Sequence, residues 1–449
     1  MSQVPSHSFQ APTGTRDFYP AELAKLRYVE QAWRSVSVRH GFDEIDGPTF
    51  EHLDLYTVKS GDAIVNELFS FTRAGGERTY ALRPEFTPTL ARMFAARAGA
   101  LPRPTKWFCT PSFFRAERPQ RGRLREFRQW NCDILGDDSP AADAELIACA
   151  VDALSALGLT HEHIKVRISH RRAVEQMLAV RGVTKEMFQA WFNLLDKVGK
   201  INNDQFIDQA RSLGMDTTRA MQMLQMMVTA SRFEEPTTQA MLSEAMGGHG
   251  PDYFKKLWVE LRAAGVADWC WLNLGIVRGL AYYTGMVFEI HEAAGGERAI
   301  AGGGRYDQLI EMFGGPATPA VGFGMGDVVL SLVLADKGLM PGEQQIADKL
   351  GNRPDAYVIS NGSPEADAQL SATVAAIRKA GLHARRSYKA TKNVGKLIQD
   401  AAKAGARFCV IVESDTGASL KNLASGAQTA VPIADLVRWI KLGETPHEG

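Results

Sequence analysis

The sequence predicts an α+β domain on a mainly antiparallel sheet, interrupted by a helical block, and a smaller α/β domain after it. Three features of the pattern lead to this fold class. Strand pairs joined by turns occupy much of the first 170 residues, a mainly helical pattern runs over 171–264, and strands alternate with helices after residue 354. Alternation of that kind is typical of a largely parallel sheet, so we expect the last part to fold separately. With 449 residues the chain is also too long for one ordinary domain.

Composition and charge exclude several classes of protein. With 45% hydrophobic and 23% charged residues, the chain has the composition of a globular protein with sizeable cores. Lys+Arg and Asp+Glu both number 51, so contact with nucleic acid would depend on local basic patches. The five cysteines are scattered and never spaced C-x-x-C, which argues against a disulfide framework or a structural zinc site. They fit a reducing compartment, and since no secretory, organellar or membrane-spanning pattern is visible, we expect a cytoplasmic protein without membrane contact.

The first predicted elements are a helix and a strand that stops at a proline. Apolar residues recur at helical spacing from Leu23 to Trp33, after the segment GTRDFYP at 14–20. The alternating pattern of GFDEIDGPTFEHLDLY then runs into Pro48, which is typical of a sheet edge because proline cannot donate to the strand ladder. Such an edge is either a plain boundary of the sheet or an oligomer contact.

A hairpin then leads to a carboxylate at a corner of the chain. Residues 67–73 and 78–83 are predicted to be two strands joined by an AGGE turn. Pro84 interrupts the second strand, and a helix is expected to begin at about Thr87. Glu85 therefore lies between strand and helix, where it either faces a pocket or stabilises the helix N-terminus electrostatically.

The stretch 113–136, FFRAERPQRGRLREFRQWNCDILG, is predicted to be two strands joined by an arginine-rich loop. Side chains of the second strand alternate between two faces. One face carries Phe127, Gln129, Asn131 and Asp133, and the other carries Trp130, Cys132 and Ile134. The apolar face belongs against a core. The polar face lies beside six arginines, which favours a ligand with an anionic and a cationic group, and the alternative is a solvated hairpin.

The sheet pattern returns after the helical block, with an arginine in an apolar stretch. The strand predicted for 275–290 places Tyr283 and Glu289 on the same face. Arg278 lies in its apolar first half, and a buried arginine needs an anionic partner. Three consecutive glycines then lie just before Arg305 and Tyr306. A glycine-spaced strand and a helix follow. Because neither a P-loop nor the Rossmann spacing is present, a nucleotide would have to be held by arginines on an antiparallel sheet.

A change in composition marks the last domain. GNRPD at 351–355 is the expected boundary, and beyond it three strands alternate with two helices, which predicts a small α/β domain with a largely parallel sheet. Arginines and lysines between 378 and 396 give this domain basic patches. These patches are either a solvated face or a contact for phosphate groups.

Taken together, these motifs resemble those of the histidyl-tRNA synthetases, a family of class II aminoacyl-tRNA synthetases, over essentially the full length. The resemblance is carried by GTRDFYP, GFDEIDGPTFE, LRPEFT, the stretch 113–136, VRGLAYYTGMVFE and GGGRYDQLIEMFGG. It implies a class II synthetase-like catalytic domain in two parts, 1–170 and 265–340, separated by a helical insertion at 171–264. Residues 354–449, which include GARFCVIVE, would form the anticodon-binding α/β domain.

The resemblance also implies a function and a site. Such an enzyme activates histidine with ATP to histidyl-adenylate and pyrophosphate, and then transfers histidine to the 3′ end of its tRNA. It implies Mg²⁺, without naming metal ligands, and a homodimer. The histidine site would comprise Glu85, Thr87, Gln129, Asp133, Tyr283 and Tyr306, and the ATP site Arg115, Glu117, Arg123 and Arg278. Of these, Arg115 and Arg278 would act catalytically by holding the α-phosphate from opposite sides.

One position departs from the family pattern. Motif three generally ends G-x-E-R, whose arginine stacks over adenine, and here the segment reads Gly326-Asp327-Val328-Val329. Val329 thus leaves the adenine side without the expected arginine. The alternative is a non-catalytic paralogue that binds histidine, like the regulatory subunit of ATP phosphoribosyltransferase. Those paralogues generally lack the C-terminal domain and the motif-two arginines, which this chain has, and a module that only binds RNA would not need Arg278.

Overall fold

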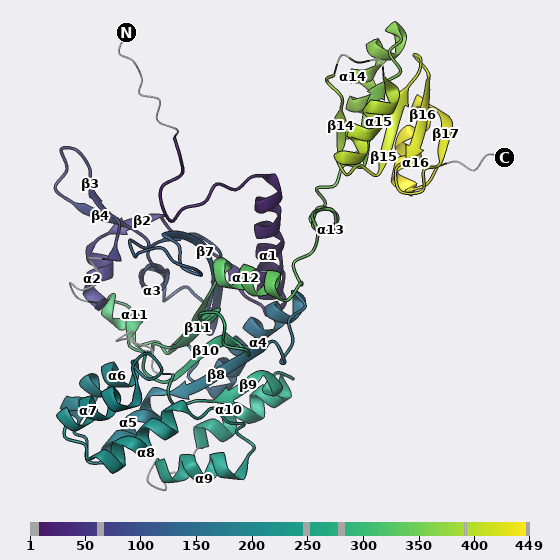
Figure 1. The fold of residues 1–449 in the computed structure, drawn as a ribbon. Helices are drawn as coiled ribbons and strands as arrows, with labels where there is room; N and C mark the ends of the chain where they lie inside the picture. Colours follow the sequence, from purple (N-terminus) through teal and green to yellow (C-terminus); the bar gives the residue numbers. More distant parts are fainter. Residues whose placement is uncertain are drawn as a thin grey trace. The chain divides into compact units, whose positions relative to one another are not determined.

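The computed structural model describes residues 9–60, 67–245, 252–276, 283–389, 391 and 393–445. The chain divides into two compact units, one built mainly on Val29–Met340 and the other mainly on the residues after Pro341 (Figure 1). The predicted strand at 275–290 is described only in part, and Arg278 lies outside the described residues.

The first unit is built on a large sheet that is mainly antiparallel, as predicted. The pairings of β1 with β5 and of β8 with β9 are parallel, and the other pairings found among the described residues are antiparallel. In spatial order, the strands are β1 (Asp43–Glu44), β5 (Thr105–Cys109), β7 (Glu126–Leu135), β12 (Ala320–Gly326), β11 (Ala301–Arg305), β10 (Met286–Glu292), β8 (Ile164–His170) and β9 (Cys270–Leu272), with β6 (Ser112–Phe114) paired to β7. The two predicted strands of the stretch 113–136 correspond to β6 and β7.

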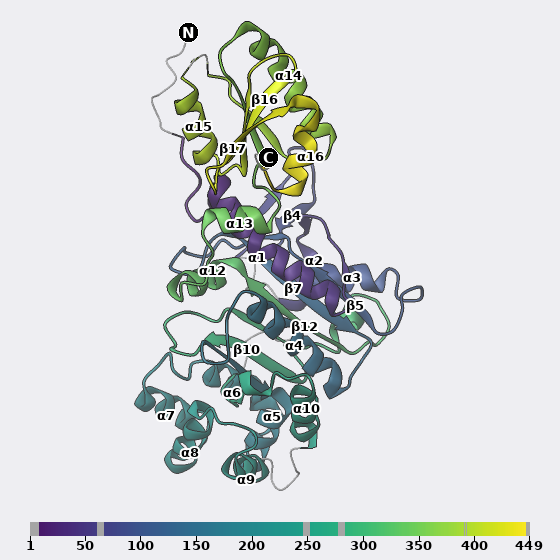
Figure 2. The ribbon, with the colours of Figure 1, turned by 90° about the vertical axis from the view of Figure 1, so that its right-hand side faces the viewer.

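Two helices, α1 (Pro20–Arg39) and α4 (Pro140–Ala156), cover one face of this sheet (Figure 2). Trp130 on β7 is fully buried against α1, where its ring stacks on Trp33 with ring centroids 6.0 Å apart. Its indole Nε1 donates a hydrogen bond to Ser37 Oγ at 2.9 Å. The apolar face predicted for this strand therefore packs against the helices, and the polar face points the other way.

A small sheet and three short helices complete the unit beside the large sheet. Its strands are β2 (Phe50–His52), β4 (Thr79–Leu82) and β3 (Ser70–Thr72), and the helices are α3 (Thr87–Ala95) and α11 (Leu309–Met312), with α2 (Asp54–Ser60) nearby. Pro48 lies just before β2, at the edge of the small sheet, as its sequence predicted. An apolar cluster joins α3, α11 and the large sheet, and Tyr283 and Tyr306 belong to it. These two rings are thereby fixed by packing.

The stretch predicted to be helical contains α5 (Arg171–Val180), α6 (Phe188–Leu195), α7 (Asn203–Ser212), α8 (Thr217–Val228), α9 (Pro236–Ala245) and α10 (Asp252–Ala263), with short 3₁₀ turns at Lys185–Met187 and Ala267–Trp269. Figure 1 shows these helices gathered beside the end of the sheet that holds β8 and β9. Met215, Met223 and Met227 are buried here, as expected of methionines that fill a helical core.

The second unit contains the three predicted strands, β13 (Ala356–Ser360), β14 (Ala384–Arg386) and β15 (Phe408–Val412), in parallel. Its described helices are α13 (Glu343–Lys349), α14 (Pro364–Lys379), α15 (Val394–Lys403) and α16 (Leu436–Leu442), with a 3₁₀ turn at Ile433–Asp435. The prediction of a largely parallel sheet was wrong in one respect. An antiparallel pair, β16 (Gly417–Asn422) and β17 (Gln428–Pro432), extends the sheet beyond β15, so two of the pairings are parallel and two antiparallel in the described part.

None of the helices in the described part of the chain has the length and apolar character needed to cross a membrane.

Candidate active site

Two adjoining cavities open on the face of the large sheet that α1 and α4 leave uncovered. The larger has a volume of about 280 Å³ and the smaller about 90 Å³. Arg115, Gln129, Gly302 and Gly324 line both, so the two cavities meet at these residues. The smaller cavity is also lined by Glu85, Thr87, Asn131, Asp133, Tyr283, Tyr306, Gly322 and Phe323.

Glycines on β12 make the space that the polar side chains of β7 occupy. A Cβ atom at Gly322 would lie 1.9 Å from Asp133 Oδ1, and one at Gly324 would lie 2.4 Å from Gln129 Nε2. Both distances are far below any real contact, so any side chain at these positions would displace the polar groups. The glycine spacing of this strand is therefore explained by close approach to the site rather than by turn formation.

Asp133 and Tyr306 form the closed end of the smaller cavity. Both are buried, with 4% and 2% of their surfaces exposed, and the Tyr306 hydroxyl donates a hydrogen bond to Asp133 Oδ1. Burial raises the pKa of Asp133 to about 7, although the hydrogen bond from Tyr306 acts in the opposite direction. An ionised carboxylate at this depth needs a cation or additional donors, so the cavity favours a ligand that brings them.

Other predicted residues complete the wall of the smaller cavity. Glu85 lies at the corner just before α3, as its sequence predicted, and its neighbour Thr87 is the first residue of that helix. On β7 the Gln129 amide donates to Asn131 Oδ1 at 3.0 Å, which fixes both side chains. The structure thus brings together all six residues predicted for the histidine site, and it adds Asn131, whose place on the polar face was predicted without a role.

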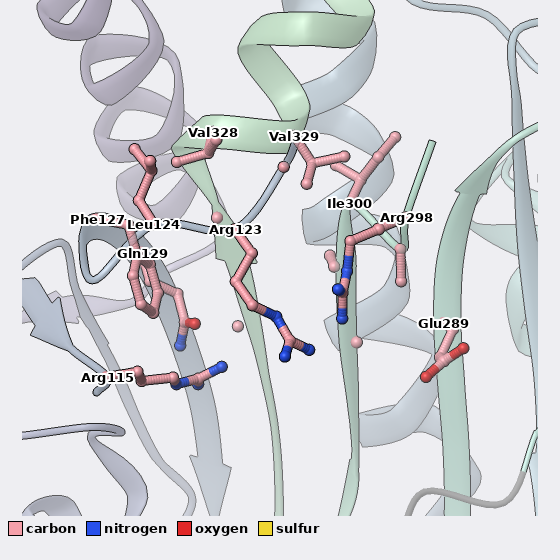
Figure 3. Close-up of a pocket in the computed structure, with 16 residues that line it drawn as sticks. Arg115, Arg123, Leu124, Phe127, Gln129, Glu289, Arg298, Ile300, Val328 and Val329 are labelled. Carbon is pink, nitrogen blue, oxygen red and sulfur yellow. The ribbon is translucent and has the colours of Figure 1, made fainter. Parts of the chain in front are cut away.

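Arg115 lines both cavities and therefore lies where they meet. Figure 3 shows its side chain on the wall of the larger cavity. Its Nε donates to the carbonyl oxygen of Pro84 at 3.1 Å, and its guanidinium carbon lies 5.1 Å from the centre of the Phe127 ring. These contacts hold a positive charge at the junction, although Arg115 is only half-buried. A ligand that spans both cavities would pass beside this guanidinium.

The remaining predicted ATP residues fall into different positions. Arg123 lines the larger cavity and forms an ion pair with Glu117. Glu117 itself, with 16% of its side chain exposed, is among the lining residues of neither cavity and acts here as the partner of Arg123. The role predicted for Arg278 concerns a residue outside the described ranges.

The larger cavity also contains two charged residues to which the sequence assigned no role. Arg298, in the loop before β11, and Glu289, on β10, both line it. Glu289 Oε2 lies 2.9 Å from Nε2 of His291 on the same strand. The period-two pattern had placed Glu289 on the same face as Tyr283, but nothing in the loop sequence AAGGERAI singled out Arg298.

The departure in motif three has a structural counterpart. Val329, with 7% of its surface exposed, forms part of the wall of the larger cavity. The carboxylate of Asp327, two residues earlier, is instead buried and turned away from the cavity lining, where it pairs with Arg16 at 2.7 Å. It also accepts a hydrogen bond from the backbone N–H of Arg128 at 2.8 Å. Asp327 thus ties the N-terminal segment and β7 to the start of α12 (Asp327–Asp336).

Comparison with known proteins places the whole chain among similar sequences. The family model described as "Histidyl-tRNA synthetase" matches residues 14–326, and "Anticodon binding domain" matches residues 355–442. A curated protein of Opitutus terrae named "Histidine--tRNA ligase" is 40% identical over 95% of this chain and 96% of its own length. One of the same name from Pyrococcus furiosus is 34% identical, covering 95% of this chain and 98% of its own.

Solved structures with the same fold include members of two kinds. Histidyl-tRNA synthetase from Nostoc sp. PCC 7120 aligns with a TM-score of 0.79 and 24% identity, covering 97% of this chain and 100% of that one. A protein of Bacillus halodurans described as an ATP phosphoribosyltransferase regulatory subunit/histidyl-tRNA synthetase aligns with a TM-score of 0.71 and 21% identity. It covers 91% of this chain and 98% of that one. At these identities the structures show a common fold.

Proposed function

The chain belongs to the histidyl-tRNA synthetase family, and we propose that it joins histidine to tRNA within the two adjoining cavities. It is a class II aminoacyl-tRNA synthetase that activates histidine with ATP to histidyl-adenylate and pyrophosphate, and then transfers histidine to the 3′ end of its tRNA. The observation that carries the proposal for the site is that Arg115 lines both cavities. A carboxylate bound in one cavity and a phosphate bound in the other would meet there.

The smaller cavity is the proposed site of the histidine side chain and ammonium group. Histidine carries an ammonium and an imidazole N–H, which suit the carboxylates of Asp133 and Glu85 and the amide of Gln129. A near-isostere without these groups would leave the buried carboxylate of Asp133 without a cationic partner, so it would bind far more weakly. Thr87, Tyr283 and Tyr306 close the remaining wall.

The larger cavity is the proposed site of ATP, which is a substrate. Phe127, Leu124 and Val329 supply apolar surface for the base, and Arg115 and Arg123 supply positive charge for the phosphates. Arg278 is proposed to reach the α-phosphate from the other side. Glu117 acts indirectly in this proposal, by holding the Arg123 guanidinium in place.

This arrangement suits adenylate formation without a general base. The carboxylate of histidine is already ionised at neutral pH and attacks the α-phosphorus in line, while the bond to pyrophosphate breaks. Catalysis then depends on positioning the two substrates and on stabilising the charge that develops on the α-phosphoryl oxygens, which Arg115 is placed to do. In the second step a ribose hydroxyl of the terminal adenosine of tRNA attacks the adenylate carbonyl, and AMP leaves.

We also propose that Mg²⁺ binds together with ATP, because the larger cavity offers a suitable carboxylate. In the described ranges, no three His, Cys, Asp or Glu side chains come together as a metal centre. An ATP-bound Mg²⁺ needs only one or two protein carboxylates, because phosphates and water supply the other ligands. Glu289 is a carboxylate on the wall of the larger cavity and would hold it. When bound, the ion would neutralise part of the phosphate charge.

We infer that the parts of the chain divide the work as their sequence suggests. Residues 1–170 and 265–340 would form the catalytic domain, 171–264 the insertion and 354–449 the anticodon-binding domain. The basic residues Arg378, Arg385 and Lys396 give the last domain charge suited to RNA phosphates. Removing residues from about Arg353 onward should therefore reduce tRNA charging more than adenylate formation. Equal losses in a truncated protein that remains folded would refute this division.

A homodimer in the cytoplasm is the proposed working form. Three aromatic rings on the small sheet, those of Phe50, Phe71 and Tyr80, pack on one another with centroids 5.6–5.8 Å apart. Phe50 and Phe71 remain 48% and 43% exposed. Exposed aromatic groups of this kind are typical of protein interfaces. Sedimentation of Phe50→Glu should then show a monomer, and an unchanged dimer would exclude this surface as the contact.

The experiment that tests the proposed function is histidine-dependent exchange of pyrophosphate into ATP, followed by charging of tRNA. We expect the purified full-length chain to show both reactions. Binding of histidine without exchange would instead indicate a regulatory paralogue.

A further inference from the structure

Arg298 projects into the larger cavity from the wall opposite β7. Figure 3 shows its side chain beside Val329 and Ile300, with its guanidinium directed into the same space as those of Arg115 and Arg123. Arg115 and Arg123 come from the stretch 113–136, whereas Arg298 comes from the loop before β11. The three guanidinium groups thus approach one region from two walls.

The charges in this cavity do not balance. Among the described lining residues, the charged side chains are these three arginines and Glu289. Partial burial and the nearby Arg123 guanidinium lower the pKa of Arg298, and Glu117 is the carboxylate that opposes this effect. Glu117 is already ion-paired with Arg123. Converging arginines with so little negative charge between them favour a ligand that carries several negative charges.

Two contacts join the loop that carries Arg123 to the loop that carries Arg298. Arg121 Nε donates to Glu297 Oε1 at 2.7 Å, so the residues that precede Gly122 and Arg298 are joined. Gly122 has a positive φ of 74° and no side chain, and a Cβ there would lie 3.6 Å from Arg298 Cδ. The arginine loop therefore packs on the stem of Arg298, and this side chain is held next to the loop that carries Arg123 before any ligand arrives.

We propose that Arg298 binds the outer phosphates of ATP together with Arg123, as a positioning residue for adenylate formation. The apolar wall made by Val329, Ile300 and Phe127 then receives the base, and the neighbouring loop supplies positive charge for the phosphates. This inference rests on the proposed function of the cavity, because it specifies how that cavity holds its nucleotide.

The test compares ATP with AMP, which has the base and sugar but lacks the outer phosphates. In pyrophosphate exchange by the full-length protein, Arg298→Ala should raise the KM for ATP about 10- to 100-fold, as loss of a charge-assisted hydrogen bond predicts. The KM for histidine should stay within about twofold, and the affinity for AMP, measured by calorimetry, should change by less than about threefold. The KM for ATP of Arg298→Lys should lie between those of the unaltered protein and Arg298→Ala, because lysine keeps the charge without the planar guanidinium group.

Controls separate this inference from the proposed function. Arg211→Ala removes an exposed arginine of α7 that is far in sequence from the residues lining the two cavities. It should leave the KM for ATP, the KM for histidine and the affinity for AMP unchanged. An Arg298→Ala protein with a normal KM for ATP would overturn the inference. Equal weakening of ATP and AMP would overturn it too, because the arginine would then act on the base or on the fold. Failure of the unaltered protein to exchange with histidine would refute the proposed function instead.

Discussion

The substitution Asp133→Asn should stabilise the ligand-free protein at alkaline pH while it removes activity. The pKa of Asp133 is raised from 3.8 to about 7 in the folded protein, chiefly by burial. Between about pH 4 and pH 7 the unfolded chain therefore releases a proton that the folded chain retains. The free energy of unfolding falls as pH rises through this window, and the full penalty is present above pH 7. Asparagine keeps the shape and does not ionise.

The size of the effect follows from the same values. Raising the pKa of a carboxyl from 3.8 to about 7 corresponds to about 4 kcal/mol of penalty for the ionised form. Between pH 4 and pH 8, the free energy of unfolding of Asp133→Asn should thus rise by up to about 4 kcal/mol relative to that of the unaltered protein. This corresponds to on the order of 5–10 °C in Tm. Thermal unfolding of both proteins at pH 5 and pH 8, without ligand, measures most of this change.

Two further measurements make the reasoning refutable. Histidine should raise the Tm of the unaltered protein at pH 8 much more than that of Asp133→Asn, because its cationic group pairs with the carboxylate. Asp208→Asn, an exposed change on α7, should show the same difference in Tm at both pH values. If the difference in Tm between Asp133→Asn and the unaltered protein were also the same at both pH values, Asp133 would not carry a burial penalty. The argument for a cationic ligand would then fail.

Two other substitutions test the geometry of the sheet. Gly322→Ala should reduce histidine-dependent exchange by at least about 100-fold because its Cβ would lie 1.9 Å from Asp133 Oδ1, whereas Gly99→Ala, which meets nothing within 4 Å, should leave exchange unchanged; similar rates for the two variants would contradict the account of β12. Arg305→Met should lower the free energy of unfolding by about 3–5 kcal/mol, because it leaves a buried carboxylate of α4 without the partner that lies 2.8 Å away. Urea unfolding measures this loss, and a change below about 1 kcal/mol would show that the pair is not structural.

Part of the wall of the smaller cavity could be predicted from the residues alone, because strand periodicity fixes which side chains share a face. On β7 the alternation of Gln129, Asn131 and Asp133 with Trp130 and Cys132 is sufficient to place the polar groups together. What periodicity does not reveal is the partner across the sheet. The contact between Gly322 and Asp133 depends on the register of β12 against β7, and these strands are far apart in sequence.

The wall of the larger cavity was less predictable for a different reason. Arg298 lies in a loop, where no period relates a residue to a face, and its neighbours in sequence are glycines, alanines and glutamate. The ion pair between Glu117, a predicted ATP residue, and Arg123 is a tertiary contact within the loop, which the sequence pattern does not reveal. The antiparallel strands β16 and β17 were missed because their segments, although no shorter than β13 and β15, lack the apolar runs of those strands.

The central claim is that histidine and ATP meet at Arg115, where the two cavities join. Single-turnover formation of histidyl-adenylate by Arg115→Ala, compared with the unaltered protein, tests it most directly. We expect the rate to fall by at least about 100-fold, because a charge held at the α-phosphate is lost, while the Kd for histidine changes by less than about threefold. A normal rate would contradict the claim, since it would place the reacting groups away from this guanidinium.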